Sequence, residues 1–511
     1  MKRAYGDTAP IAAYATPLGE SALAVIRTSG ERSLEMAASI FSRPGTLLQA
    51  PGNTLVHGWV LLPPVGGGGE KTGRQRIDEV LISVYRGPRS FTGEDGVDIS
   101  CHGGIAAAKG VMEALRAAGF QDALPGEFTF RAFMNGKLDL TRAESVMELV
   151  SAKTGRGRDF AVGRLSGNLE REIREIQALL VQTLAGAELF LDYSEEDLPS
   201  AGADPGGISA DEAAGKLPER AAAEHARERL RALAAAYSRE RLYREGALVV
   251  LAGRPNAGKS SLFNLLLREE RSIVTDIPGT TRDWIEAWIS LEGIPIRLAD
   301  TAGLHASPDP VERIGMERSR ELLRAADLIL YIIDGTAGIT GEDRAFFREF
   351  GGSNEKKAPK PVIALWNKAD EAPLNGQCDA PPGAHTLPAC GGAVDFPILE
   401  TSAKTGQGLP ELTAALSAAL EKAAGAGGKD GSRLPGEGKN PAGIGTERQR
   451  DLVVRAAAAV EEALLLADRR EPLDIIAPLL REGINALGEI TGEVSTADIL
   501  ETMFSRFCVG K

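Results

Sequence analysis

Cysteine is scarce in this chain, with four residues among 511. They are Cys101, Cys378, Cys390 and Cys508, and none of them belongs to a C-x-x-C pair. Such spacing disfavours both a zinc ribbon and a disulfide framework, so we expect reduced thiols. We also expect no metal site around Cys378, Cys390 and His385, because a second pair of ligands is missing.

Long apolar runs are absent as well. No stretch approaches the ~20 consecutive apolar residues that a membrane-spanning helix needs. The N-terminal segment MKRAYGDT lacks the apolar core of a secretory signal. Together these absences predict a cytoplasmic protein.

The remaining composition is typical of a globular protein with several domains. Hydrophobic residues make up 43% and charged residues 25% of the chain, which excludes wholesale disorder. At about 150 residues per domain, a length of 511 residues predicts about three domains. The net charge of −13 argues against wrapping nucleic acid non-specifically, although a local basic patch that docks one RNA stays compatible with it.

The region from residue 1 to about residue 125 mixes short strand patterns with turns. Residues 22–27 (ALAVIR) and 79–85 (EVLISVY) predict strands. The glycines at 66–69 predict a loop, and the tripeptide RGP at 86–88 predicts a turn. This alternation predicts an α+β domain.

Two later segments show the three- and four-residue spacing of amphipathic helices. The apolar positions of the first segment are Leu169, Ile173, Ile176, Leu180 and Leu184, and those of the second are Leu452, Ala456, Val460, Leu464 and Ala467. One-sided helices must bury their apolar face, most simply against each other. We therefore expect both segments in one helical bundle, with the region between them inserted into it.

The inserted region, roughly 245–423, has the pattern of a parallel α/β sheet. Apolar runs typical of buried strands alternate there with helical patterns, and they lie at residues 247–252, 328–333 and 362–366. Segments 351–360 and 371–394 are rich in Pro and Gly and predict loop insertions. The Gly-, Lys- and Pro-rich stretch 424–445 predicts a linker.

A phosphate-binding motif begins this region. Residues 253–260 (GRPNAGKS) match G-x-x-x-x-G-K-[ST] between a strand pattern and the helical run 261–267, which is the context that the motif requires. Its glycines let backbone N–H groups close around phosphate oxygens at a helix N-terminus. We expect Lys259 to reach the β- and γ-phosphates and the Ser260 hydroxyl to hold Mg²⁺.

Three further motifs follow at the spacings of guanine nucleotide sites. Residues 300–303 (DTAG) follow a strand pattern at 294–298 and predict a carboxylate near the metal and a glycine beside the γ-phosphate. Residues 367–370 (NKAD) resemble the guanine-reading motif of GTPases, in which a carboxylate accepts from the N1 and N2 donors that adenine lacks. Residues 402–404 (SAK) resemble the motif whose backbone contacts the base. Each motif alone is weak, but four in order predict GTP.

One position departs from the small signalling GTPases, which place a water-orienting glutamine directly after the DTAG motif. Leu304 stands there in this chain. An apolar side chain cannot accept a proton or orient a water. Either hydrolysis is slow or another residue supplies this role.

Several short motifs outside the nucleotide site carry a closer resemblance. They are ATPLG at 15–19, VIRTSG at 25–30, FTGED at 91–95, CHGG at 101–104, LPGEFT at 124–129, NGKLDLT at 135–141 and FSRFCVGK at 504–511. Together with the nucleotide motifs, they make the chain similar to the MnmE (TrmE) family of tRNA-modifying GTPases over essentially its whole length.

The resemblance implies a multidomain fold of α+β and α/β parts. A tetrahydrofolate-binding α+β domain would span residues 1–135. A discontinuous helical domain would comprise 136–243 and 446–511, the second segment ending in a tail at the folate site. A Ras-like parallel-sheet G domain would occupy 244–423, followed by the linker at 424–445.

The resemblance also implies an activity and its partners. The family hydrolyses GTP to GDP in a potassium-stimulated way and works with an FAD-dependent partner protein of the MnmG (GidA) type. Together they install an aminomethyl-type group, such as carboxymethylaminomethyl, at C5 of uridine 34, the wobble position of certain tRNAs. The implied folate is 5,10-methylene- or 5-formyl-tetrahydrofolate, and the implied assembly is a homodimer within a heterotetramer.

Ion ligands and catalytic residues are carried over by matched position. The resemblance assigns K⁺ to Asn256, Thr275, Ile277 and Thr280, and Mg²⁺ to Ser260 and Thr281. Glu312 would orient the attacking water in place of the missing glutamine, and Lys259 is the other implied catalytic residue. Taken alone, Glu312 is ordinarily an exposed carboxylate and Asn256 a loop-stabilising amide.

The implied GTP-binding set combines the motifs with the loop between them. It comprises Asn256, Ala257, Gly258, Lys259, Ser260, Ser261, Thr275, Asp276, Ile277, Pro278, Gly279, Thr280, Thr281, Asp300, Thr301, Ala302, Gly303, Asn367, Lys368, Asp370, Ser402, Ala403 and Lys404.

For the folate, the resemblance implies a pocket lined by Arg27, Glu94, Lys137 and Lys511. Cations suit the glutamate carboxylates of the ligand, and a carboxylate suits the N–H edge of the pterin. Cys508 falls where the family has a cysteine near the folate. A redox or nucleophilic role requires a lowered thiol pKa, and a buried apolar thiol is the alternative.

Two other functions remain open at this point. A regulatory GTPase switch in ribosome assembly or stress response would share the nucleotide motifs, but such proteins usually carry an RNA-binding module such as a KH domain. We find no G-x-x-G loop in a helix–helix setting and no second G domain. A folate enzyme with a vestigial G domain would not need the complete motif set.

Overall fold

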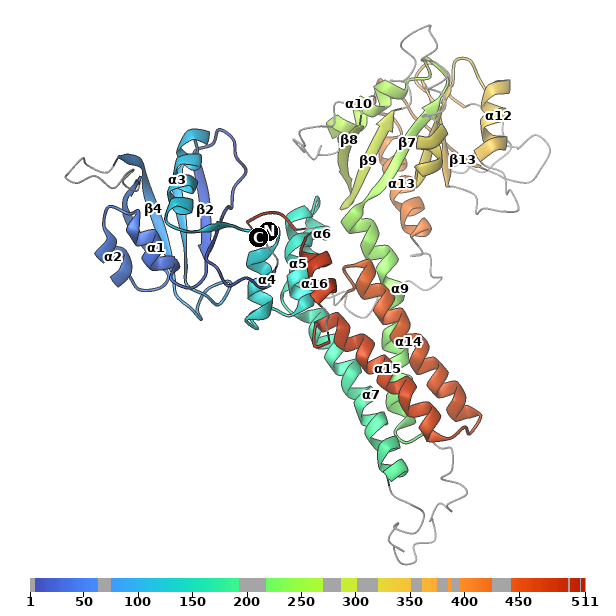
Figure 1. The fold of residues 1–511 in the computed structure, drawn as a ribbon. Coiled ribbons are helices and arrows are strands. Elements are labelled where there is room, and N and C mark those ends of the chain that lie inside the picture. The colour runs from blue at the N-terminus through green and yellow to red at the C-terminus, as the bar shows by residue number, and fades with distance from the viewer. Residues whose placement is uncertain are drawn as a thin grey trace, which may run out of the picture. The chain divides into compact units, whose positions relative to one another are not determined.

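The computed structural model describes residues 5–62, 75–192, 217–269, 286–300, 320–350, 361–374, 385–387, 396–424, 443–494, 497–505 and 507–510. Backbone contacts divide the chain into two compact units (Figure 1). The first comprises Met1–Met147, Leu165–Ala226 and Arg455–Lys511, and the second comprises Glu148–Arg164 and Arg227–Val454.

A six-stranded sheet forms the N-terminal part of the first unit. Its strands are β1 (Ile11–Tyr14), β2 (Leu23–Ser29), β3 (Thr54–Leu61), β4 (Arg76–Tyr85), β5 (Gly96–His102) and β6 (Gln121–Asp122), in the order β3-β4-β5-β2-β1-β6. The pairing of β1 with β6 is parallel and the others are antiparallel. The strands predicted at 22–27 and 79–85 correspond to β2 and β4.

One face of this sheet is buried. The other, the open face, is exposed along β3 and β4 but is covered at β1, where Ile11 and Ala13 pack with Phe128. Alternate residues such as Ile26, Ile82 and Ile99 are at most 1% exposed, and they pack with α1 (Ser33–Ser39) and α3 (Ile105–Ala117). The short helix α2 (Pro44–Gln49) adds Leu47 to the same core. Strand periodicity therefore turns the intervening side chains to the opposite face, which no helix of this core covers.

An aromatic cluster joins the two ends of the chain within the first unit. Helix α4 (Glu127–Met134) contributes Phe130, and α16 (Ala497–Phe504) contributes Phe504; their ring centroids lie 5.4 Å apart in an edge-to-face arrangement. Tyr5 and Phe507 pack on the same rings. The C-terminal segment is thereby held beside α4, where the backbone N–H of Gly126 donates to the carbonyl of Cys508.

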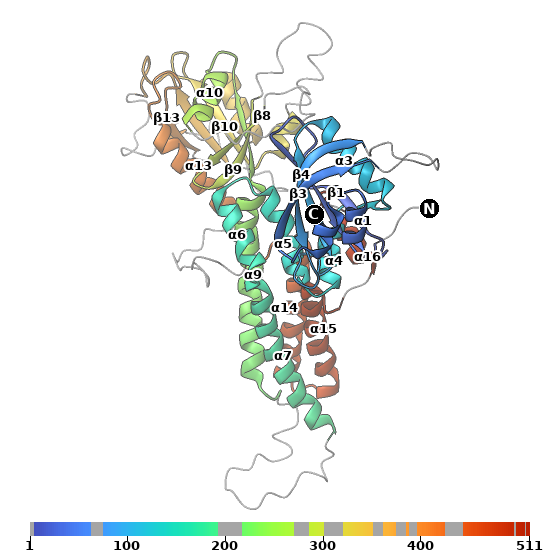
Figure 2. The same ribbon diagram turned by 90° about the vertical axis from the view of Figure 1, so that its left-hand side faces the viewer.

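Long helices complete the first unit. Helix α7 (Asn168–Asp192) lies side by side with α15 (Leu473–Thr491), as Figures 1 and 2 show from two directions. The predicted apolar positions of α7 from Leu169 to Leu180 are fully buried, but Leu184 is only half-buried and the smaller Thr183 and Ala187 point inward instead. The apolar positions of α14 (Glu447–Asp468) are all buried as predicted.

The second unit contains a seven-stranded sheet in the order β12-β13-β11-β10-β7-β9-β8. Its strands are β7 (Ala247–Gly253), β8 (Glu286–Leu291), β9 (Ile294–Asp300), β10 (Leu328–Asp334), β11 (Val362–Asn367), β12 (His385–Leu387) and β13 (Phe396–Glu400). The five central strands are parallel, and β8 and β12 pair antiparallel at the edges. The three strands predicted from apolar runs are β7, β10 and β11.

Both faces of this sheet are covered, as the near-continuous apolar strands require. Helices α10 (Lys259–Glu269) and α13 (Leu409–Ala423) bury one face, and α12 (Gly341–Phe350) packs against the other. The prediction of a multidomain chain with α+β and α/β parts is confirmed. The predicted domain boundaries, and the linker at 424–445 that lies mostly outside the described residues, stay predictions.

The remaining helices are α5 (Leu140–Ser151), α6 (Gly155–Leu165) and α9 (Arg220–Glu245). In the second unit, Arg164 of α6 is 2% exposed and binds Glu148 at 2.7 Å and Glu240 at 3.0 Å. Among the described residues, no helix has the length and apolar character needed to cross a membrane.

Candidate functional site

The phosphate-binding motif forms a tight loop between β7 and α10. Gly253 has φ +142°, and a Cβ there would lie 2.3 Å from the carbonyl oxygen of Ile332. Gly258 has φ +97°, and a Cβ there would lie 2.1 Å from Nδ2 of Asn367. Asn256 also adopts a left-handed conformation, with φ +64°, and is exposed. Glycine is therefore required at two positions both for conformation and for space.

Lys259 and Ser260 stand at the first turn of α10. The Nζ of Lys259 donates to the carbonyls of Gly253 and Arg254 at 2.8 Å each, so its ammonium lies within the loop. Burial lowers the pKa of Lys259, and the carboxylate of Asp300 opposes that shift. A lysine held this way is placed to pair with phosphate oxygens.

The side chains of Ser260 and Asp300 meet at the start of α10. The hydroxyl of Ser260 donates to Oδ2 of Asp300 at 2.9 Å, and Asp300 is 1% exposed. A hydroxyl and a carboxylate oxygen beside a phosphate loop are the hard donors that Mg²⁺ prefers. These two residues fit a magnesium ion bound together with phosphate.

Asn367 connects three of the predicted motifs. Its Nδ2 donates to the carbonyl of Ala257 in the phosphate loop at 2.7 Å. Its Oδ1 accepts from the backbone N–H of Ala403 in the SAK motif at 3.0 Å. The side chain is 1% exposed, so both contacts are shielded from water. The NKAD motif predicts Asn367 for the nucleotide site, and the structure adds these two partners.

The residues that follow Asn367 face the same region. Lys368 has φ +65°, and its carbonyl accepts from the N–H groups of Glu371 and Ala372, which closes a turn around Asp370. The Nζ of Lys404 lies 4.0 Å from Oδ2 of Asp370. Ser402 shapes its own loop, since its hydroxyl accepts from the N–H of Thr405.

Part of the predicted site lies outside the described residues. These positions are Thr275, Asp276, Ile277, Pro278, Gly279, Thr280, Thr281, Thr301, Ala302, Gly303, Leu304, Glu312 and Lys511. Their predicted roles with K⁺, Mg²⁺, the lytic water and folate stay predictions.

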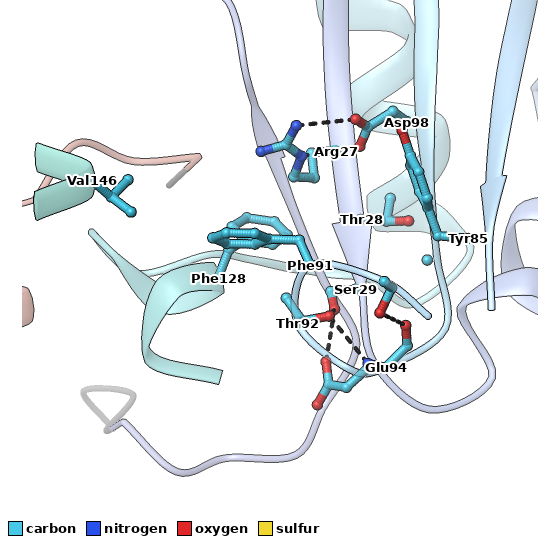
Figure 3. A pocket seen from close by; sticks show the side chains of 12 residues that line it. Arg27, Thr28, Ser29, Tyr85, Phe91, Thr92, Glu94, Asp98, Phe128 and Val146 are labelled. Carbon is cyan, nitrogen blue, oxygen red and sulfur yellow. Dashed lines mark hydrogen bonds and ion pairs between the residues drawn. The ribbon is translucent and has the colours of Figure 1, made fainter. Parts of the chain in front are cut away.

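A second candidate site is a pocket of about 320 Å³ on the N-terminal sheet. It is lined by Arg27, Thr28, Ser29, Tyr85, Ser90, Phe91, Thr92, Glu94, Gly96, Asp98, Phe128 and Val146. Figure 3 shows a pair formed by Arg27 and Asp98 on one side and Glu94 near Ser29 and Thr92 on the other, with two phenyl rings between them. Two predicted folate residues, Arg27 and Glu94, therefore line one cavity.

Glu94 is held in place by a network that sequence reasoning missed. Its Oε2 accepts from Ser29 at 2.7 Å and from Nη1 of Arg131 at 3.1 Å. Arg131 also binds Glu127 at 2.9 Å and the carbonyls of Asp7 and Ala9. An arginine inside the apolar run FTFRAFM was the available signal, because a buried cation requires partners.

Three further positions are Lys137 and the two described cysteines, Cys101 and Cys508. Lys137 does not line the pocket, and its Nζ donates to the carbonyl of Pro88 at 2.8 Å. Cys508 is exposed. Cys101 is buried, and burial raises the pKa of its thiol to about 11, which excludes a ready thiolate.

Known proteins resemble this chain along its length. The model of the MnmE helical domain matches residues 140–508, and that of the GTP-binding protein TrmE N-terminus matches residues 10–137. The tRNA modification GTPase MnmE of Treponema denticola is 42% identical over 514 residues, covering 100% of this chain and 99% of the relative. The protein of the same name from a Synechococcus species is 41% identical over 507 residues, covering 99% of each.

Among solved structures, the likeness is partial. A structure of Era in complex with MgGDPNP and nucleotides 1506–1542 of 16S ribosomal RNA is 25% identical, covers 42% of this chain and 66% of that chain, and has a TM-score of 0.25. The full-length relatives and the two domain models show that the chain belongs to the MnmE (TrmE) family of tRNA modification GTPases.

Proposed function

We propose that this GTPase binds GTP with Mg²⁺ at the loop between β7 and α10 and uses potassium-stimulated hydrolysis to drive modification of wobble uridine 34. The observation that carries the nucleotide part is the pair of hydrogen bonds from Asn367, which joins the phosphate loop to the base-reading segments. Asp370 follows Asn367 by three residues, in the turn that starts at Lys368. The same short segment therefore contacts the phosphate loop and presents a carboxylate that can accept from guanine.

Each described phosphate-loop side chain has a task in that reaction. Lys259 donates to phosphate oxygens in place of the two loop carbonyls to which it donates in the structure. Ser260 and Asp300 hold Mg²⁺, directly or through water, and the ion neutralises charge that develops on the phosphates. Asn256, exposed on the same loop, supplies an oxygen toward K⁺, and Glu312 orients the water where Leu304 replaces the usual glutamine.

The pocket of the N-terminal sheet suits a reduced folate. Glu94, fixed by Arg131, offers a carboxylate to the N–H edge of a pterin, and Phe91 and Phe128 offer apolar ring faces. Arg27 offers a cation, although Asp98 already binds it at 3.1 Å. Lys137 would meet the glutamate tail from outside the residues that line the cavity, and Lys511 is the other cation proposed for that tail.

The open face of the N-terminal sheet suits a second copy of the chain. Leu23, Leu55 and Leu81 are 60%, 66% and 46% exposed on strands β2, β3 and β4. Exposed leucines that share one face of a sheet favour burial in an interface. A homodimer through this face is the proposed assembly, and the FAD-dependent partner would join it to form a heterotetramer that acts on tRNA.

Two measurements test the proposal. GTP hydrolysis should be at least about tenfold faster in KCl than in NaCl, and Glu312→Ala should lose turnover while keeping GTP affinity. Equal rates in both salts would remove the potassium assignment.

The modification role needs its own test. Transfer RNA from cells that lack the protein should be digested and analysed by mass spectrometry for the C5-modified wobble uridine. The modified nucleoside should be missing, and should return with the wild-type gene but not with Glu312→Ala. Unchanged tRNA would favour the alternative, a GTPase switch without modification chemistry.

A further inference from the structure

The loop after β10 touches the guanine-reading turn, although none of the nucleotide motifs includes it. This loop, residues 334–336 (DGT), begins at Asp334, the last residue of β10. In the sheet, Asp334 is the register partner of Asn367, the last residue of β11. The parallel pairing therefore brings the carboxyl end of β10 to the place where the NKAD motif starts.

Asp334 makes a short ion pair with the lysine of that motif. Its Oδ2 lies 2.6 Å from Nζ of Lys368, and the two side chains are 15% and 31% exposed. Its Oδ1 accepts from the backbone N–H of Thr336 at 3.0 Å and from the Thr336 hydroxyl at 2.6 Å. Both carboxylate oxygens are engaged, so the carboxylate has one orientation.

The charge state of Asp334 agrees with this geometry. Partial burial raises the pKa of Asp334, but the hydrogen bonds from Lys368 and Thr336 outweigh it and lower the pKa below its ordinary value. The carboxylate is therefore charged at neutral pH, and the ion pair with Lys368 is intact.

The backbone of the same loop packs directly on the turn. The N–H of Gly335 donates to the carbonyl of Asn367 at 2.9 Å. A Cβ on Gly335 would lie 2.6 Å from Nε1 of Trp366 and 2.7 Å from the carbonyl oxygen of Asn367. That indole donates in turn to the carbonyl of Ala372 at 2.8 Å, at the far end of the turn.

Lys368 needs such support because of its backbone conformation. Its φ of +65° lies in the left-handed region, which non-glycine residues adopt only at a cost in conformational energy. The direction of the chain at Lys368 decides where Asp370 points, since the carbonyl of Lys368 closes the turn that contains Asp370. A side chain that anchors Lys368 therefore bears on guanine recognition.

We propose that Asp334 is a positioning residue for guanine recognition: by holding Lys368, it fixes the turn that presents Asp370 to the N1 and N2 donors of the base. This inference rests on the proposed GTP site and adds a determinant outside its motifs. Thr336 contributes by orienting the carboxylate of Asp334.

The test measures affinities for GDP and for inosine diphosphate (IDP), whose base lacks the 2-amino donor. Isothermal titration calorimetry gives both dissociation constants for the full-length wild type, Asp334→Asn, Lys368→Met and the double variant. Asp327→Asn is the matched control, because Asp327 precedes the opposite end of β10 and accepts from the N–H of Leu248.

Wild type should bind GDP at least about tenfold more tightly than IDP, because IDP loses one hydrogen bond to a carboxylate. Asp334→Asn should weaken GDP binding by about tenfold and IDP binding by less, so that the ratio falls toward one. The double variant should match Lys368→Met alone, because Asp334 acts through Lys368. Asp327→Asn should match wild type.

If Asp334 has only a structural role, Asp334→Asn should weaken the binding of GDP and of IDP equally, which would overturn the proposal. Affinity losses that add up in the double variant would also overturn it. If Asp334→Asn lowers the melting temperature too far for titration, Thr336→Val gives the same reading with the carboxylate retained. It should lower the ratio, while Thr336→Ser should preserve it; equal ratios for both would contradict the proposal. A wild type that does not discriminate GDP from IDP would instead reject the underlying GTP site.

Discussion

At the scale of single residues, Gly258 combines a left-handed backbone with close packing, and the two effects can be separated. Gly258→Ala places a methyl group 2.1 Å from Nδ2 of Asn367 and keeps φ at +97°. Gly136 has φ +66°, and a Cβ there would meet no other atom within 4 Å, so Gly136→Ala is the matched control for backbone strain alone.

We expect Gly258→Ala to weaken GDP binding by at least about tenfold, because Asn367 must move away from Ala257 and Ala403. Gly136→Ala should bind GDP as wild type does and lose about 1 kcal/mol of stability. Fluorescence titration with a labelled GDP analogue and thermal unfolding measure the two effects. Similar GDP affinities for both variants would contradict the packing argument.

Some residues of the two candidate sites could be predicted from the sequence, and others could not. Motif order predicted Lys259, Ser260 and Asn367 for the nucleotide site, because nucleotide chemistry requires those residue types at those spacings. It could not identify Arg131 or Asp334, since their roles depend on contacts to distant residues, Glu94 and Lys368. Side-chain partners across long sequence separations have no local pattern.

At the scale of elements, a cluster of buried charged side chains connects α6 with α9 and with the segment that precedes α14. Arg164 is shared by Glu148 and Glu240, and a Cβ on Gly443 would lie 1.7 Å from Oε1 of Glu240. Burial raises the pKa of Glu240 to about 7, with Arg164 opposing this rise and Glu148 adding to it.

This raised pKa predicts a pH dependence with a definite sign. As pH rises from about 4.5 to 7, the unfolded chain releases the Glu240 proton before the folded chain does, so this carboxyl lowers stability over that window. Glu240→Gln should therefore gain stability relative to wild type between pH 5 and pH 8, by at most about 3 kcal/mol. Glu228→Gln, an exposed glutamate on the same helix, should show no such trend.

Thermal unfolding at several pH values measures the difference. A gap between Glu240→Gln and wild type that stays constant from pH 5 to pH 8 would show that Glu240 does not take up a proton on folding.

Elements were also the part of the fold that the sequence predicted best. Apolar runs identified β7, β10 and β11 because buried parallel strands are apolar on both faces. Helical spacing identified α7 and α14, but it assigned Leu184 to the buried stripe, where the smaller Thr183 and Ala187 face inward. Spacing gives the face of a helix to within one position, and packing partners decide the rest.

At the scale of the whole molecule, the open face of the N-terminal sheet predicts self-association. Leu81→Glu should weaken the dimer, because a charge would enter an apolar interface, whereas Leu48→Glu on α2 should not. These leucines are similarly exposed, at 46% and 42%, but only Leu81 lies on the open face. Light scattering after gel filtration distinguishes monomer from dimer; a Leu81→Glu dimer as stable as wild type would place the interface elsewhere.

The most direct measurement exchanges the base that the site accepts. Asparagine at position 370 would offer an amide donor where xanthine carries a carbonyl and guanine an amine. Asp370→Asn should lower kcat/KM for GTP by about tenfold to 100-fold and raise it for xanthosine triphosphate. A variant that hydrolyses GTP as wild type does, with no gain for xanthosine triphosphate, would contradict the assignment of this chain's guanine site.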